Sequence, residues 1–462
     1  MRKISLDHRL LENFNWPLLL SSLALCAGGL LNLYSISAGV EFSGDWSWFT
    51  RQCFYLVPAL AGLGMVLLLD YQYLKKLAWP LYLLGLLSLV AVLLIGTKVN
   101  GATRWLDLGL FRFQPSEFIK VALVLVLAAW LTRHGQAGGL GFRDFVVPVL
   151  LMAVPFVLIH RQPDLGTALH LAVTILPMFL VFRFRAHVVA ILAVLAALLL
   201  GLACYMQYTG SWHMLLDKGL VKPHQADRVK VYLNPEDHRE SGGWQVGQSK
   251  NAVGSGQFTG RGFMEGPQHR NGFLPEAETD FAFAALAEEW GFMGSALILA
   301  AFAFLLTHGL SVAQFSKDRF GSLLALGLTS LLFWQVVINV GMVTGLFPVV
   351  GIPLPFISYG GTSLVTTFLS VGLILNIGMR RYLFQERPIR ANPEVWNRPD
   401  EIISFPKNGG SIRTLGPDTP LNPEIHPQHR LPHTRPWAKY LRRSKARGID
   451  YWRFRLPDHS TG

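Results

Sequence analysis

Long apolar runs separated by short polar stretches fill most of the chain as far as residue 384. Because the hydrocarbon core of a bilayer is about 30 Å thick, a helix needs roughly 20 apolar residues to cross it. The first run, from Trp16 to Tyr34, is longer than the apolar region of about 7–15 residues in a cleaved signal peptide, so we interpret it as a retained span. Ten spans are predicted, at residues 16–34, 53–69, 78–96, 116–132, 145–160, 165–182, 187–207, 280–307, 320–341 and 362–379.

These runs predict an all-α fold, a polytopic integral membrane helix bundle of about ten transmembrane helices, because open sheets cannot satisfy their backbone hydrogen bonds in lipid. Residues 1–384 form the predicted membrane domain, which includes one long outer loop at about 208–279. That loop holds nine glycines between Gly242 and Gly272, so its backbone is either flexible or closely approached. The remaining segment, 385–462, is a proline-rich basic tail that is predicted to be cytoplasmic and mostly disordered.

The composition agrees with a membrane protein. Hydrophobic residues make up 51% of the chain and charged residues 15%, whereas a soluble domain carries about 25% charged residues, so an ordinary soluble enzyme is excluded. A net charge of +12 would suggest nucleic acid for a soluble protein, but here it indicates basic cytoplasmic loops and contact with anionic membrane lipids. No nucleic-acid partner is therefore expected. Cys26, Cys53 and Cys204 lack C-x-x-C spacing and give no sign of a disulfide framework or a zinc site.

The distribution of Lys and Arg in short loops predicts the orientation of the chain. With the N-terminus inside, basic residues occur in every predicted inner loop and after the last span: Lys75, Lys76, Arg133, Arg143, Arg183, Arg185, Lys317, Arg319, Arg380 and Arg381. Both termini then face the cytoplasm. The outer loop near 97–114 nevertheless holds Lys98, Arg104 and Arg112. An anionic ligand would explain basic residues placed against the rule.

The polar sequence that leads into the fourth span is the first candidate site. Pro115 suits the first turn of a helix, Glu117 complements the positive helix end, and Lys120 follows within reach of Glu117. One interpretation is a capped helix start with a local ion pair. The other is a functional site, because charges inside a membrane span are costly: Lys120 and Arg104 would meet a phosphate group. Trp105 is either an interfacial anchor or a stacking partner for a substrate.

A second candidate site precedes the eighth span, where three acids, Glu276 and Asp280 among them, occur within five residues. They either cap the helix or leave Asp280 at the edge of the apolar phase as a general base. The proline-aspartate sequence within 162–167 is interpreted as helix capping, and the proline- and glycine-broken stretch 339–363 as a wall of the site. The glycine string 254–260 lacks the strand and the Lys-Ser/Thr ending of a phosphate loop, so it is not interpreted as a nucleotide site.

Five motifs occur in order and together resemble the SEDS (shape, elongation, division and sporulation) family of peptidoglycan glycosyltransferases. They are Gly101–Trp105, Gln114–Glu117, Gln162–Thr167, Leu274–Phe281 and Pro353–Gly361. The resemblance covers about residues 10–382 and excludes the tail. Within the family, the segments 248–256 and 341–353 are more similar to the RodA branch, the elongation polymerases, than to the FtsW branch. The segment Met264–Phe273 matches the RodA pattern only loosely.

The resemblance implies a membrane enzyme that polymerises lipid II into glycan strands on the outer face of the bacterial cytoplasmic (inner) membrane. Asp280 matches the essential aspartate of the family and would act as general base with inversion at the sugar. The implied substrate-binding residues are Arg104, Trp105, Gln114, Glu117, Lys120, Glu276 and Ser358. Mg²⁺ or Mn²⁺ is a candidate cofactor with unknown ligands, and the implied partner is a class B penicillin-binding protein that cross-links the strands.

Three other functions fit part of the pattern. A lipid II flippase or transporter would share the many helices and the basic loops, but would be expected to bury charges near the bilayer midplane on broken helices. The candidate charges here cluster at predicted outer helix ends, which favours chemistry at the membrane surface. A non-enzymatic scaffold for cell-wall synthases, and a polymerase or ligase of another polyprenyl-linked glycan, are the remaining alternatives.

Overall fold

The computed structural model describes residues 13–38, 47–99, 102–107, 109, 112–134, 142–181 and 242–380, together with four strands of the tail. The chain divides into two compact units, Met1–Phe384 and Gln385–Gly462. The second unit contains β4 (Ile402–Ser404), β5 (Arg413–Leu415), β6 (Leu441–Ala446) and β7 (Ile449–Phe454), paired antiparallel as β4–β5 and β6–β7. Outside these strands, the predicted disorder of the tail stays a prediction.

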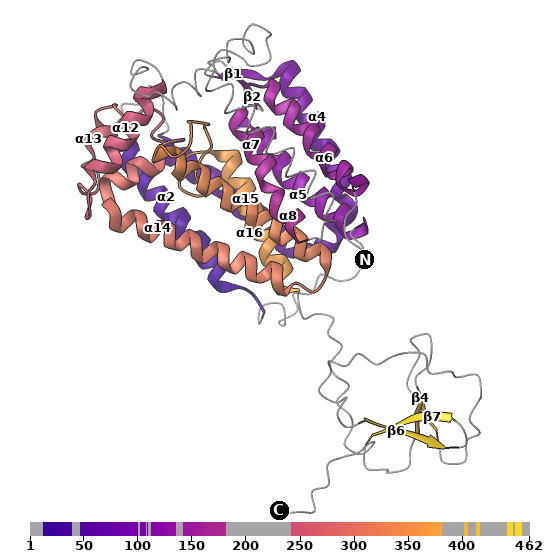
Figure 1. The fold of residues 1–462 in the computed structure, drawn as a ribbon. Coiled ribbons are helices and arrows are strands. Elements are labelled where there is room, and N and C mark those ends of the chain that lie inside the picture. Colours follow the sequence, from indigo (N-terminus) through magenta and orange to yellow (C-terminus); the bar gives the residue numbers. More distant parts are fainter. Residues whose placement is uncertain are drawn as a thin grey trace, which may run out of the picture. The chain divides into compact units, whose positions relative to one another are not determined.

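The first unit is a bundle of helices (Figure 1). In chain order they are α2 (Trp16–Ala38), α3 (Trp48–Leu68), α4 (Tyr71–Ile95), α5 (Pro115–His134), α6 (Phe142–Arg161), α7 (Leu165–Thr174), α8 (Leu176–Leu180), α12 (Gly242–Ser255), α13 (Pro267–Arg270), α14 (Ala282–Phe315), α15 (Arg319–Val343) and α16 (Gly361–Met379). Several begin after a polar side chain that accepts a hydrogen bond from the first turn, as Ser47, Asp70 and Asp318 do for α3, α4 and α15. These side chains satisfy N–H groups that have no partner within the helix.

Most predicted spans correspond to helices. In the described part of the chain, seven helices are long and apolar enough to cross a membrane, namely α2, α3, α4, α5, α14, α15 and α16. The predicted spans 145–160 and 165–182 correspond to the shorter apolar stretches Val146–Arg161 and Leu165–Leu180, the second of which is divided where α7 gives way to α8 at Ile175. The predicted span 187–207 lies outside the described residues. The predicted all-α membrane fold is confirmed.

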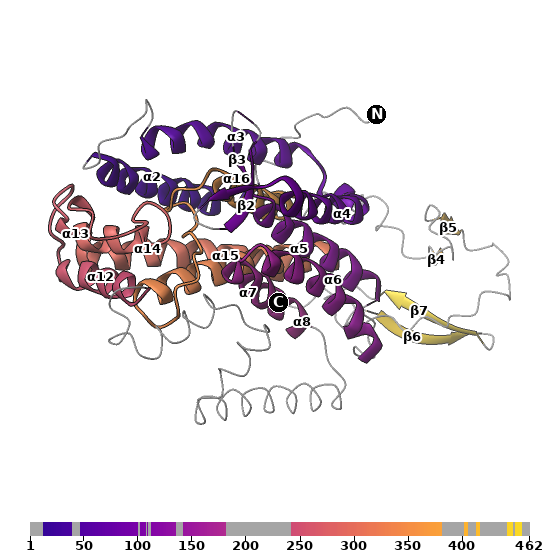
Figure 2. The same ribbon diagram turned by 90° about the horizontal axis from the view of Figure 1, so that it is seen from above.

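Helices α5, α15 and α16 form the centre of the bundle (Figure 2). Some 83% of the apolar segment of α5 and of α16 is buried, against 17% of that of α3, so the peripheral helices present apolar side chains to lipid. Small residues let the central helices approach closely. A Cβ on Gly327 of α15 would stand 2.5 Å from Val124 Cγ1 of α5.

Two structured regions connect the helices at one end of the bundle. A three-stranded antiparallel sheet joins α4 to α5, with β2 (Ala102–Asp107) between β1 (Thr97–Val99) and β3 (Arg112–Phe113). Within the predicted long loop, α12 and α13 pack against the start of α14 (Figure 2). The buried Ser249 of α12 donates a hydrogen bond to the carbonyl of Val343 at 2.8 Å. From residue 242 onward, this loop is therefore folded onto the bundle.

A kink interrupts α14 at Gly291, which has φ 64° and ψ −160°. Two glycines of the glycine-rich segment pack against the backbone beside this kink. A Cβ on Gly256 would stand 2.0 Å from the carbonyl oxygen of Ala287, and a Cβ on Gly260 would stand 2.0 Å from that of Glu289. The sequence left open whether the backbone at the loop glycines is flexible or closely approached. For Gly256 and Gly260, it is closely approached by other backbone.

We expect Gly260→Ala to destabilise the protein by about 1–3 kcal/mol, the usual effect of forcing extra atoms into a packed site. The added methyl group would collide with a backbone carbonyl, and the φ of +88° at Gly260 disfavours any L side chain. The midpoint of thermal unfolding of the purified protein in detergent measures the effect. Gly254→Ala is the matched control, because a Cβ at Gly254 in α12 meets nothing within 4 Å. Equal midpoints for the two variants would contradict the packing argument.

Candidate active site at the sheet end of the bundle

The segment between α15 and α16 joins two of the predicted motifs. Gly166, at the start of α7, lies against this segment, because a Cβ there would stand 2.1 Å from the carbonyl oxygen of Val350. At the next residue, a Cβ on Gly351 would stand 3.1 Å from Oδ2 of Asp280. The segment thus forms a wall that contacts the start of α7 on one side and the Asp280 carboxylate on the other.

The predicted Glu117–Lys120 pair forms within α5 and is buried. Nζ of Lys120 lies 2.8 Å from Oε1 of Glu117, and the two side chains are only 3% and 5% exposed. The hydroxyl of Thr366 on α16 lies 3.4 Å from Oε2 of Glu117. An unpaired charge buried inside a membrane helix bundle would be costly. The pair therefore stabilises both charged groups in the interior of the bundle.

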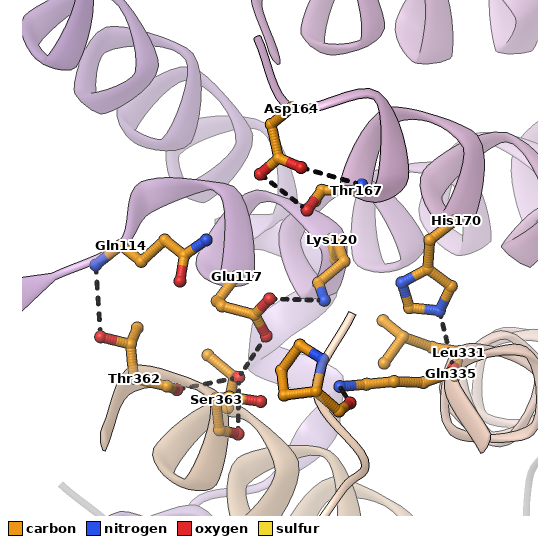
Figure 3. A network of polar contacts seen from close by, with 12 residues as sticks. Gln114, Glu117, Lys120, Asp164, Thr167, His170, Leu331, Gln335, Thr362 and Ser363 are labelled. Atoms are coloured by element: carbon orange, nitrogen blue, oxygen red, sulfur yellow. Dashed lines mark hydrogen bonds and ion pairs between the residues drawn. The ribbon is translucent and has the colours of Figure 1, made fainter. Parts of the chain in front are cut away.

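His170 of α7 lies on the other side of Lys120 (Figure 3). It is fully buried, and its Nε2 lies 2.9 Å from the carbonyl of Leu331. Because a carbonyl only accepts, Nε2 donates this bond, so Nδ1 of the neutral ring is an acceptor. Nδ1 has no hydrogen-bond partner in the described part of the protein, and the charge of Lys120 acts on the ring. The ring and Glu117 therefore lie on opposite sides of the Lys120 side chain.

Arg104 contacts the start of α7. Its Nη2 donates to the carbonyl of Pro163 at 2.6 Å, and its Nε lies 3.8 Å from Oδ2 of Asp164. Asp164 is the N-cap of α7 and accepts from the backbone N–H of Thr167 at 3.2 Å, as the capping interpretation of this motif predicts. Each of the two candidate cations therefore has its own acidic partner.

Asp280 is half-buried and lies immediately before the N-cap of α14. Asn339 of α15 donates through Nδ2 to the Asp280 carbonyl at 2.9 Å and to the Ile352 carbonyl at 2.7 Å. One amide thus fixes the backbone of Asp280 to the wall segment. The Asp280 side chain lies beside Gly351, which has no Cβ and so leaves room for the carboxylate.

The acids before α14 do not cap it through the helix N-cap, which is Phe281 without a side-chain capping hydrogen bond. Glu276 instead closes the preceding turn, where its Oε2 accepts from the Thr279 hydroxyl at 3.1 Å and its carbonyl accepts from the Phe281 N–H at 3.1 Å. Burial raises the pKa of Glu278. Glu276 therefore stabilises the turn before α14, and both interpretations of the acidic cluster stay predictions.

The other candidate substrate-binding residues are engaged in local structure. Ser358 accepts through Oγ from the backbone N–H of Leu354 at 2.8 Å and is buried. The backbone N–H of Gln114 donates to Thr362 Oγ1 at 3.2 Å. Trp105 is half-buried in the middle strand β2. Their roles toward a substrate stay predictions.

Sequence reasoning missed Arg51, at the start of α3. Its positive charge and that of Arg112 both act on the phenol of Tyr359. Burial raises the pKa of Tyr359, whose backbone N–H donates to the carbonyl of Glu278 at 2.7 Å. Tyr359 therefore connects the acidic segment that carries Asp280 with the positive charge of Arg51. A basic residue at a predicted outer span end is the same signal that singled out Arg104, so it could have been found.

The expected divalent metal finds no ready site in the part of the protein that the structure describes. No group of three or more His, Cys, Asp or Glu residues is placed there to hold a metal ion. Mg²⁺ and Mn²⁺ bind through several oxygen ligands. The predicted metal stays a prediction, and no catalytic step below is routed through it.

Fold and site together define a multi-pass membrane protein with buried polar groups at one end of its bundle. Residues 16–383 match the FtsW/RodA/SpoVE family of cell cycle proteins. The chain is 35% identical over 378 residues to a probable peptidoglycan glycosyltransferase FtsW of Trichlorobacter lovleyi, covering 79% of this chain and 93% of the relative. It is 31% identical over 428 residues to the peptidoglycan glycosyltransferase RodA of Treponema pallidum, covering 80% and 98%.

The fold is also similar to that of a solved structure, a chain from a peptidoglycan synthase complex that coordinates polymerisation and cross-linking. The TM-score is 0.67 at 30% identity, with 80% of this chain and 98% of that chain covered. The chain belongs to the FtsW/RodA/SpoVE family. The expected family and the expected enzyme class, a membrane glycosyltransferase, are confirmed.

Proposed function

We propose that the chain polymerises lipid II into β-1,4-linked glycan strands, with Asp280 as general base. The observation that carries this proposal is the position of Asp280. Its backbone is held by Asn339, and its carboxylate lies half-buried beside Gly351 at the end of the bundle. A positioned carboxylate of this kind can accept the proton of a sugar hydroxyl. The names of the similar glycosyltransferases support peptidoglycan as the product.

The proposed reaction joins two sugars with inversion. The 4-hydroxyl of the acceptor attacks the anomeric carbon of the donor, and Asp280 takes the hydroxyl proton. A new C–O bond forms while the bond to the undecaprenyl pyrophosphate breaks, and the pyrophosphate leaves with the electron pair. Because the pyrophosphate is α-linked, attack from the opposite face gives a β-1,4 bond.

Arg104 and Lys120 are proposed to stabilise the charge that grows on the departing pyrophosphate. The Arg104 side chain is 25% exposed, so a phosphate can approach it directly. Lys120 is 3% exposed and paired with Glu117, so a phosphate reaches it only if the helices separate locally. Trp105, Gln114, Glu276 and Ser358 are proposed further contacts to the disaccharide.

We place the site on the outer face of the bacterial inner membrane, with both termini in the cytoplasm. The loop basic residues support this orientation. The similarity to a chain of a synthase complex that also cross-links glycan supports a transpeptidase partner, a class B penicillin-binding protein. A role in elongation rests on the RodA-like segments of the sequence and on similarity to a protein named RodA.

Incubation of the purified full chain with lipid II, with and without a class B penicillin-binding protein, tests this function. We expect glycan strands that a muramidase degrades, in larger amount when the partner is present. A parallel assay in vesicles measures movement of labelled lipid II across the bilayer. Movement without polymerisation would identify a flippase. Neither activity, with intact binding to the partner, would identify a scaffold.

A further inference from the structure

A buried charged cluster joins α13 to α14 and is separate from the contacts described for Asp280. The imidazole of His269 stands between two consecutive acids of α14: Nδ1 is 3.1 Å from Oε2 of Glu288, and Nε2 is 3.1 Å from Oε1 of Glu289. The side chains are 2% and 0% exposed. With both ring nitrogens facing carboxylates, the ring donates from both only in its protonated form.

Neighbouring segments complete this cluster, which we term the His269 clamp (His269, Glu288 and Glu289). The backbone N–H of Gln268 donates to Oε1 of Glu288 at 2.8 Å. Ser35 of α2 donates its hydroxyl to Oε1 of Glu289. A Cβ on Gly266 would stand 2.4 Å from the imidazole, so the ring fits only because that residue is glycine.

The clamp closes a loop of the chain around Asp280. His269 and Glu288 are 19 residues apart in sequence, and Asp280 lies between them. Next to His269, the carbonyl of Gln268 accepts hydrogen bonds from the N–H of Phe273 at 2.9 Å and from that of Leu274 at 3.0 Å. On the other side, the first turns of α14 lead from Asp280 straight to the two acids. Both ends of the segment that carries the carboxylate are therefore fixed at one point.

We propose that His269 is a positioning residue for the glycosyl transfer: its ion pairs with Glu288 and Glu289 fix the segment 270–281 on α14 and so set the place of Asp280. The inference rests on the proposed function of Asp280 and deepens it. His269 pairs with both acids at the two ends of this segment, and Asn339 holds the backbone of Asp280 near its C-terminal end. Release of the clamp leaves the hydrogen bonds from Asn339 to Asp280 and from Tyr359 to Glu278 to hold the segment.

The clamp makes this arrangement dependent on pH. Burial opposes protonation of His269, but the hydrogen bonds and charges of Glu288 and Glu289 outweigh it and raise the pKa from 6.5 to about 9. In the described part of the chain, the charged side chain of Arg270 lines a small hollow together with the ring. Helices α2 and α12 contribute the uncharged Ser35 and Ser255 to the cluster. Because the folded-state pKa is raised, the stabilisation is complete below pH 6.5 and is lost as the pH rises through about 9.

Two variants of the full chain test the proposal in the lipid II assay. We expect His269→Gln to lower the turnover at saturating lipid II by about 10–100-fold, the size expected for a misplaced catalytic group, with little change in KM. We expect Glu289→Gln to lower turnover near pH 7 less than His269→Gln does, and to move the alkaline fall of the pH profile down by about one pH unit, because one of the two acids that raise the His269 pKa is neutralised. His308→Gln, at a half-buried histidine of the same helix outside the clamp, is the control.

Hydrogen exchange in peptides that span 270–281 gives a second measurement, independent of activity. We expect faster exchange there in His269→Gln, and unchanged exchange in α15. A Glu289→Gln profile that superimposes on that of the unmodified protein, or unchanged exchange in 270–281, would overturn the clamp. If His269→Gln does not fold, the pH profile of Glu289→Gln alone tests the proposal. If the unmodified protein fails to polymerise lipid II, the proposed function is wrong. The exchange measurement still shows whether the His269 clamp fixes the segment 270–281.

Discussion

Replacement of Asp280 by asparagine is expected to lower the rate of lipid II polymerisation by about 10²–10⁴-fold, the contribution of a general base. An amide is close to a carboxylate in size but cannot take the proton of the acceptor hydroxyl. The hydrogen bond from Asn339 goes to the backbone carbonyl of residue 280, so the substitution leaves it in place. The initial rate of strand formation by the purified protein, measured at saturating lipid II, provides the test.

Replacement of an aspartate by asparagine at the end of strand β2 provides the control. Asp107 is 46% exposed and lies 3.9 Å from Arg112, so Asp107→Asn removes a weak surface ion pair and should change the rate less than twofold. Both variants should elute as folded protein at the same volume. A rate for Asp280→Asn within twofold of the unmodified protein would rule out the assigned general base.

Helix positions were predictable because the length of an apolar run is a local property. The runs that begin near residues 16, 116, 320 and 362 coincide closely with α2, α5, α15 and α16. The break in α14 was not predictable, because it depends on contacts with a distant segment. A Cβ on Gly291 would stand 2.3 Å from the backbone nitrogen of Gly260, and no periodicity in either segment shows that they meet.

The same distinction applies to the site. Glu117 and Lys120 could be paired from the sequence, because three residues along a helix place two side chains on one face. Arg104 and Asp164 could not, since their contact joins β2 to α7 across the fold. That Arg104 and Lys120 act on one phosphate stays a prediction, and the structure adds that each cation contacts a different acid.

Removal of Glu117 is expected to have the largest effect on stability. Glu117→Ala leaves the ammonium of Lys120 buried without its carboxylate, and breaking a buried pair in this way costs about 3–5 kcal/mol. Lys120→Met should cost less, because the remaining carboxyl group can take up a proton and keep its contact with Thr366. The yield of monodisperse protein and the midpoint of thermal unfolding in detergent measure both effects. A Glu117→Ala protein as stable as the unmodified chain would show that Lys120 finds another counter-charge.

The double variant Glu117→Gln with Lys120→Met separates the structural role of the pair from its chemical role. Both charges are removed together and the volumes are nearly kept, so the unfolding midpoint should return close to that of the unmodified protein. If Lys120 stabilises the departing pyrophosphate, the rate of polymerisation should stay about 10²–10³-fold low, as it does when a donor to the developing charge is lost elsewhere. Recovery of both stability and rate would limit the pair to a structural role, and the stabilisation of the leaving group would then fall to Arg104.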